Sequence, residues 1–202
     1  MYCIDHTAAE PIMLINTHIG FDVEDGMGVD GAEFQRELLQ LDSMGKKRIQ
    51  VWINSPGGNV MDGYNIFSAI CDSKTPVDTY AKGMVASIAG AIFMAGRKRY
   101  MTDYSSLMMH NPFGGDDKKQ LGIMKDSIAT MIHSKSQLPQ SEVGYMMDKT
   151  TWIVYGIVSL AAFYLAVTFF FNKKKKGCCN KGCGTPHEKP SVGKEPDRKS
   201  VV

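Results

Sequence analysis

A serine at the expected start of a helix is the first residue whose type and setting could do chemistry. Ser87 lies among small residues in the stretch Gly83-Met-Val-Ala-Ser87-Ile-Ala-Gly90. The helix dipole and the free amides of a first helical turn stabilise negative charge, and the amide of Ile88 is the natural donor there. A serine that only caps or packs a helix is the alternative interpretation of a single residue of this type.

A histidine and a glycine-rich turn could complete such a site. His110 closes an apolar strand in Leu107-Met-Met-His110-Asn-Pro112, which places an imidazole at the edge of the expected sheet. Histidine is the usual base for a serine, because its unperturbed pKa of about 6.5 lets it exchange a proton near neutrality. In Asn54-Ser-Pro-Gly-Gly58, glycines let backbone amides approach a developing oxyanion. Each stretch alone is also typical of an ordinary turn or a structural histidine.

The elements that must position these residues alternate between short β-type runs and helical patterns. This rhythm predicts an α/β domain with a predominantly parallel sheet, in which loops at the strand ends carry the chemistry. The expected strands are 12–15, 49–53, 77–81, 99–101 and 106–110, and the expected helices are 32–41, a stretch ending near 70, 87–95 and 117–135.

Length and composition indicate one globular domain with an appendage. The chain has 202 residues, of which 44% are apolar and 22% charged, and its formal net charge is +2. This balance gives no pull towards nucleic acid, so we expect no nucleic-acid partner. Five cysteines with scattered spacing argue against a disulfide framework. We expect no cofactor and no metal in the globular part.

Together the three stretches resemble the active-site motifs of the proteolytic subunit of the Clp protease family, in the same order along the chain. The resemblance covers 11–152 and is closest to phage-encoded members. It implies a crotonase-related fold, a serine endopeptidase with Ser87 as nucleophile and His110 as general base, and oxyanion-hole amides from Gly58 and Ile88. It also implies a polypeptide substrate, a homo-oligomer and an ATPase unfoldase partner, since the sequence holds no nucleotide-binding loop.

The family places an acid beyond the long helix, where it orients the histidine. Asp148 is the nearest acid and is our choice for this role, although a strict register against Trp152 puts Thr150 at that position. A catalytically weak or inactive scaffold at a membrane is therefore the alternative function. A crotonase-like acyl-CoA enzyme is a third interpretation, and the pairing of Ser87 with His110 argues against it.

From Trp152 onward the sequence departs from the family. Residues 152–171 carry no charged side chain, and about 20 helical residues rise about 30 Å, so this stretch predicts a transmembrane helix. A buried core helix is the alternative. A basic tail follows over 172–202 and is expected to be disordered. Its cysteines suit reversible acylation, with zinc binding as the second choice; they are Cys178, Cys179 and Cys183.

The predicted organisation has four parts. They are an N-terminal extension over 1–10, a C-terminally truncated peptidase domain over 11–151, the transmembrane helix over 152–171 and the tail over 172–202. The location depends on the last two parts. If the sequence from Trp152 onward is a junction with foreign sequence, the domain is expected in the cytoplasm. If it is native, the protein is expected to be anchored in a membrane.

Overall fold

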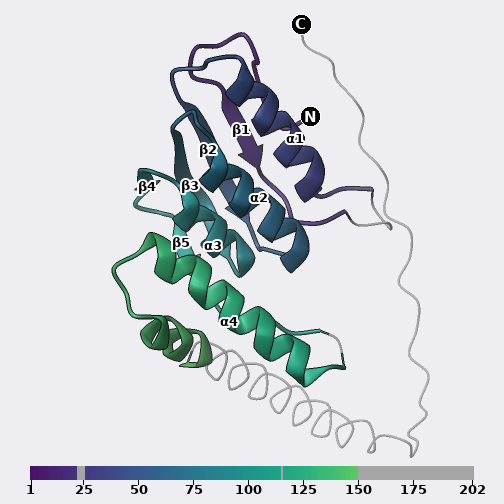
Figure 1. The fold of residues 1–202 in the computed structure, drawn as a ribbon, viewed down its shortest axis with the longest axis vertical. Coiled ribbons are helices and arrows are strands. Elements are labelled where there is room, and N and C mark those ends of the chain that lie inside the picture. Colours follow the sequence, from purple (N-terminus) through teal and green to yellow (C-terminus); the bar gives the residue numbers. More distant parts are fainter. Residues whose placement is uncertain (22–25, 115, 150–202) are drawn as a thin grey trace, which may run out of the picture. The chain divides into compact units, whose positions relative to one another are not determined.

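The computed structural model describes residues 1–21, 26–114 and 116–149, which form an α/β domain (Figure 1). Its strands are β1 (Ile12–Ile15), β2 (Ile49–Ser55), β3 (Val77–Ala86), β4 (Arg99–Met101) and β5 (Ser106–Met108). Its helices are α1 (Gly31–Ser43), α2 (Val60–Asp72), α3 (Ile88–Ala95) and α4 (Lys118–Lys135), and 140–149 is also helical. The sheet order is β1-β2-β3-β4 with β5 on β3, and every pairing is parallel. The predicted α/β class with a predominantly parallel sheet is confirmed.

Three helices cover one face of this sheet. Parallel neighbours need crossover connections, and α1, α2 and α3 supply them, lying side by side in Figure 1. Alternate residues of β2 show the consequence, because Ile49, Val51 and Ile53 are fully buried beneath the helices. On the opposite face Tyr80 and Tyr100 stack with their ring centroids 4.6 Å apart.

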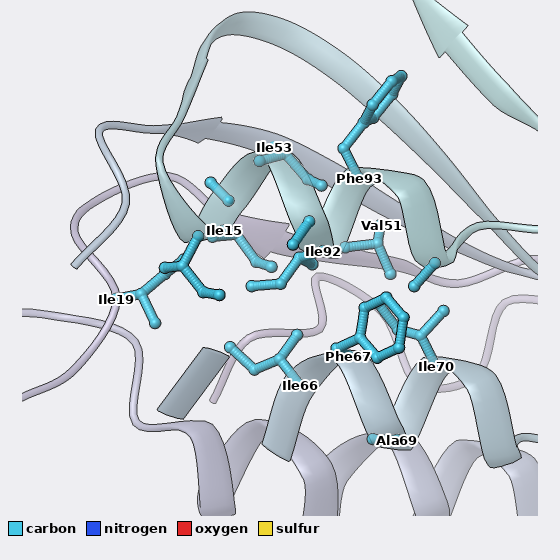
Figure 2. Close-up of a cluster of buried hydrophobic side chains, with 14 of the residues drawn as sticks. Ile15, Ile19, Val51, Ile53, Ile66, Phe67, Ala69, Ile70, Ile92 and Phe93 are labelled. Carbon is cyan, nitrogen blue, oxygen red and sulfur yellow. The ribbon is translucent and has the colours of Figure 1, made fainter. Parts of the chain in front are cut away.

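The main apolar core lies between the helices and β2. Ile66, Phe67 and Ile70 recur at helical spacing along α2, so they share one stripe of that helix. Figure 2 shows these side chains rising from α2 toward Val51 of β2 and Ile92 of α3. All of these side chains are buried, so the packing of α2 and α3 on the sheet supports the turns that follow β2 and β3.

Polar side chains define where most of the helices begin. Asp30 accepts a hydrogen bond from the Glu33 N–H at 2.8 Å and caps α1. Asn59 caps α2 and Asp117 caps α4 in the same way. These bonds satisfy amides that have no intrahelical partner.

The first residues of the chain add to the sheet. Cys3 pairs antiparallel with Met13, and the Leu14 N–H donates to the Tyr2 carbonyl at 2.9 Å. The Glu37 carboxylate of α1 accepts from the Tyr2 and Cys3 amides. Part of the predicted extension over 1–10 is therefore bonded into the domain.

One expectation meets a different outcome, and another is not tested by the described residues. β3 continues to Ala86 rather than ending at 81, and its second half pairs with β5. In the ranges given above, no helix is long and apolar enough to cross a membrane. The predicted transmembrane helix over 152–171 and the tail over 172–202 lie outside the described residues.

Candidate active site

Ser87 lies at the sharp turn between β3 and α3, and its backbone is strained. Its φ is 57° and its ψ is −130°, and no other non-glycine residue in the described ranges has a positive φ. Such a conformation costs about 1–3 kcal/mol and persists where the surroundings hold it. Ser87 occupies the N-cap position of α3, yet its hydroxyl makes no capping bond. The capping part of the alternative interpretation is therefore wrong.

Neighbouring strands and a glycine hold Ser87 in place. Its N–H donates to the Met108 carbonyl of β5 at 2.8 Å. Gly57 approaches from the turn after β2 with a φ of 93°. A Cβ at Gly57 would lie 2.6 Å from the Ser87 Cβ and 2.7 Å from the Ala86 carbonyl oxygen. Only glycine fits there, because both the contact and the left-handed backbone exclude a side chain.

Hydrogen bonds hold the Pro-Gly-Gly turn in place and leave one of its backbone N–H groups without an acceptor in the described residues. The Ser55 hydroxyl, which is fully buried, accepts from the Gly57 N–H at 3.1 Å. Ile19 donates its N–H to the Gly57 carbonyl at 2.8 Å and accepts from the Asn59 N–H at 2.7 Å. Among the residues that the structure describes, none accepts from the Gly58 N–H.

A second amide is available on the other side of Ser87. Ile88 is the first residue of α3, so its N–H has no acceptor within the helix. The Gly58 and Ile88 amides are therefore candidate donors beside Ser87, and the oxyanion hole that the resemblance implies stays a prediction.

His110 follows β5 and is partly buried. Its Nδ1 lies 2.7 Å from the backbone carbonyl oxygen of Asn111, and its ring lies 5.1 Å from that of Phe113. A carbonyl oxygen only accepts, so Nδ1 carries a proton in this bond, and in the neutral ring the lone pair is then on Nε2. Within the described part of the chain no hydrogen bond joins His110 to Ser87. Catalytic hydrogen bonds are often long without substrate and tighten when it binds.

Asp148 contacts neighbours of His110 rather than His110 itself. Its Oδ1 accepts from the Lys125 ammonium at 2.7 Å and from the Asn111 side-chain amide at 2.7 Å. The Lys125 ammonium, and then the Asn111 amide, hold the pKa of Asp148 below its usual range. Asp148 and Lys125 also line a pocket of about 430 Å³ between α4 and the helical residues 140–149. The predicted direct bond from Asp148 to His110 is not among the bonds of the described residues.

Sequence reasoning missed the residues that support the turn. Asn54 accepts from the Met84 N–H at 3.0 Å, which ties the turn after β2 to β3. The sequence showed only that Asn54, Ser55 and Gly57 belong to the turn motif. It did not predict which residues they would bond to or contact. For metals, the described ranges contain no group of three or more His, Cys, Asp or Glu side chains that could hold an ion.

A family model described as Clp protease matches residues 30–155 of this chain. The chain belongs to the Clp protease family. Two relatives of this Clp family chain are named ATP-dependent Clp protease proteolytic subunit. The one from Porphyromonas gingivalis is 33% identical over 131 residues, 59% of this chain and 59% of the relative. The one from Pleurastrum terricola is 31% identical over 133 residues, 57% of this chain and 68% of the relative.

Solved structures agree with this assignment. A ClpP1 mutant from Listeria monocytogenes superposes with a TM-score of 0.60 at 25% identity, covering 68% of this Clp family chain and 78% of the other. The ClpP protease catalytic domain from Plasmodium falciparum gives a TM-score of 0.59 at 24% identity, covering 69% and 74%, and shows the fold alone. The predicted family is confirmed. The expected closeness to phage-encoded members stays a prediction.

Proposed function

We propose that this chain is a serine endopeptidase that hydrolyses peptide bonds through an acyl-enzyme on Ser87. The Ser87 hydroxyl attacks the scissile carbonyl while His110 Nε2 takes its proton and later delivers it to the leaving amine. The oxyanion is stabilised by the Gly58 and Ile88 amides. Water then attacks the acyl-enzyme by the same route and releases the second product.

The observation that carries this proposal is the conformation of Ser87. A serine held at a φ of 57° between a strand and a helix, with no capping bond, has its hydroxyl presented at a sharp turn. Backbone strain of this kind persists where the surroundings over-determine it, and such positions cluster at functional sites. The contact with Gly57 brings the glycine-rich turn against the same side chain.

The tautomer of His110 supports the role of general base. Because Nδ1 donates to the Asn111 carbonyl, the basic lone pair is on Nε2, the nitrogen that must accept the Ser87 proton.

The relatives' names suggest the partners. They are proteolytic subunits of ATP-dependent proteases, so we infer a homo-oligomer that receives polypeptide substrates from a separate ATPase unfoldase. The match spans only 59% of the length of the Porphyromonas gingivalis protein, so these partners are part of the proposal. The cytoplasmic location and the membrane anchor over 152–171 likewise stay predictions.

A fluorophosphonate probe tests the nucleophile on the purified full chain. The wild type should become covalently labelled, and Ser87→Ala should not. Ser134→Ala is the matched control, because the hydroxyl of this exposed serine donates to the Met131 carbonyl of its own helix and makes no other hydrogen bond in the described part of the chain. Equal labelling of wild type and Ser87→Ala contradicts the proposal.

A non-catalytic scaffold is the second candidate, and one observation favours it. In the described ranges His110 bonds to neither Ser87 nor Asp148. Folded wild-type protein that neither cleaves an unstructured polypeptide nor reacts with the probe would support the scaffold. Cleavage that disappears in Ser87→Ala would exclude it.

A further inference from the structure

We propose that the backbone carbonyl of Asn111 orients His110, and that Asp148 acts one residue further away by holding the Asn111 side chain. The inference rests on the proposed function of Ser87 and His110. It makes Asn111 and Asp148 positioning residues rather than catalytic ones.

The first step is the contact between His110 and Asn111. In a serine triad a carboxylate bonds to the protonated ring nitrogen and keeps the imidazole in the useful tautomer. Here the Asn111 carbonyl occupies that position, 2.7 Å from Nδ1. A neutral carbonyl performs the same selection of tautomer and orientation, because it can only accept.

The second step is the anchoring of Asn111. Its Nδ2 donates to Asp148 Oδ1 at 2.7 Å, a bond strengthened by the charge of the carboxylate. Pro112 follows and restricts the backbone of Asn111 to extended conformations. The position of the Asn111 carbonyl that accepts from His110 is therefore restricted in two ways, by Pro112 and by the hydrogen bond from the Asn111 side chain to Asp148.

The third step is the charge of Asp148. Lys125 Nζ also lies 2.7 Å from Oδ1, so the carboxylate is already paired with an ammonium. The negative charge of Asp148 is thus balanced by Lys125, and what remains for Asn111 is an acceptor oxygen. A direct counter-charge for an imidazolium would need the carboxylate itself against the ring.

Two substitutions of Asp148 separate these roles. Both bonds go to Oδ1, so Asp148→Asn keeps an acceptor oxygen for Asn111 and should leave peptide cleavage close to wild type. Asp148→Ala removes it and should lower kcat about a hundredfold with little change in KM, the cost of a misplacement of about 1 Å. If Asp148→Asn instead loses about ten thousandfold, Asp148 is a direct triad acid and the proposal fails.

The Asn111 variant tests the shared path. Asn111→Ala should lose as much kcat as Asp148→Ala, and the double variant should lose no more than either single one. Independent losses that multiply in the double variant would overturn the proposal. So would an Asp148→Ala protein with full activity.

Asp126→Ala is the matched control, because this exposed carboxylate lines the same pocket and should leave cleavage unchanged. Should Asp148→Ala fail to fold, the comparison of Asp148→Asn with Asn111→Ala still decides. Ser87→Ala runs alongside. If cleavage survives in that variant, the proposed function fails; if cleavage is lost there, the Asp148 variants test positioning alone.

Discussion

The proposed nucleophile, Ser87, and the proposed base, His110, lie on parts of the molecule that are held very differently. Ser87 stands between Ala86 and Ile88, each 1% exposed, and the turn bearing Gly57 packs against it. Every residue of β5, which leads to His110, is exposed, and α4 buries only a short apolar stripe. We name these regions the core turn (55–58 and 86–88) and the arm (106–149).

The difference shows how each of these two residues is positioned. The core turn can hold a strained serine because buried neighbours leave it no other conformation. The arm buries apolar side chains of its two helices, but β5, which leads to His110, is exposed. His110 is therefore oriented by single hydrogen bonds such as the one to the Asn111 carbonyl. Changes in the core turn should therefore abolish function, and changes in the arm should adjust it.

The largest effect is expected where the two regions must act together. Ser87→Ala and His110→Ala should each lower peptide cleavage about as much as the double variant, because both remove the same proton-coupled attack. In a serine peptidase the whole constellation is worth about a millionfold in kcat. The measurement is cleavage of a quenched peptide by all members of the cycle. Losses in activation free energy that simply add would show that the two residues do not share a step.

A matched pair of glycine substitutions sharpens the comparison. Gly57→Ala places a Cβ 2.6 Å from the Ser87 Cβ, which should displace Ser87 and the neighbouring Gly58 amide and lower kcat about a hundredfold to a thousandfold. Gly122→Ala adds a Cβ in open space on α4 and should raise the free energy of unfolding by about 0.5–1 kcal/mol. Peptide kinetics and urea unfolding measure both. Equal activity of the two variants would contradict the distinction between the regions.

Core and arm isoleucines should differ in stability. Ile92 is fully buried beneath the sheet, so Ile92→Ala should lower the free energy of unfolding by about 2–5 kcal/mol. Ile123 of α4 is 58% exposed, and Ile123→Ala should change it by no more than about 0.5 kcal/mol. Urea unfolding monitored by circular dichroism gives both values. A large loss in Ile123→Ala would mean that something covers the arm.

Local pattern was enough to predict most of the fold. β1 and β4 have the predicted bounds, because each is a short β-type run that ends before polar residues. β3 is longer than predicted, because Lys82 and Gly83 interrupt the apolar pattern on which the prediction was based. The second half of the strand, Met84–Ala86, forms through pairing with β5, which lies further along the chain. Such pairing has no local signature.

The site could be predicted only as far as its motifs reach. The type and order of the motifs picked out Ser87 and His110, but the φ of Ser87 depends on the packing of Gly57 against it. The bond from Lys125 to Asp148 joins two helices whose approach no single stretch encodes. Sequence proximity to Trp152 therefore selected Asp148 without revealing its partners.

The smallest effect is expected from the pH dependence of the Lys125–Asp148 ion pair in the arm. The buried carboxylate of Asp78 in the core serves as the comparison. Burial raises the pKa of Asp78, but the Arg97 guanidinium, the Lys98 N–H and the Arg48 charge together outweigh it, so the pKa lies below its usual range. Asp78 is fully buried, whereas the Asp148 side chain is 46% exposed. Removing a partner of a buried pair is costly, while exposed pairs contribute about 0–1 kcal/mol.

The arm pair can be isolated with Lys125→Met, compared with wild type by urea unfolding between about pH 7 and pH 3. The pKa of Asp148 is lowered in the folded state, so its pairing stabilises the protein fully above the unfolded value of about 3.9 and loses that effect as pH falls through the lower folded value. The free energy of unfolding of the wild type should therefore exceed that of Lys125→Met by at most about 1 kcal/mol near neutrality. This difference should shrink in acid and in about 1 M salt. Lys74→Met is the control, because this exposed lysine has no carboxylate within ion-pair distance in the described residues. A difference in the free energy of unfolding well above about 1 kcal/mol that persists in salt would show that the Asp148 pair behaves like a buried ion pair of the core. The arm would then be held as firmly as the turn that carries Ser87.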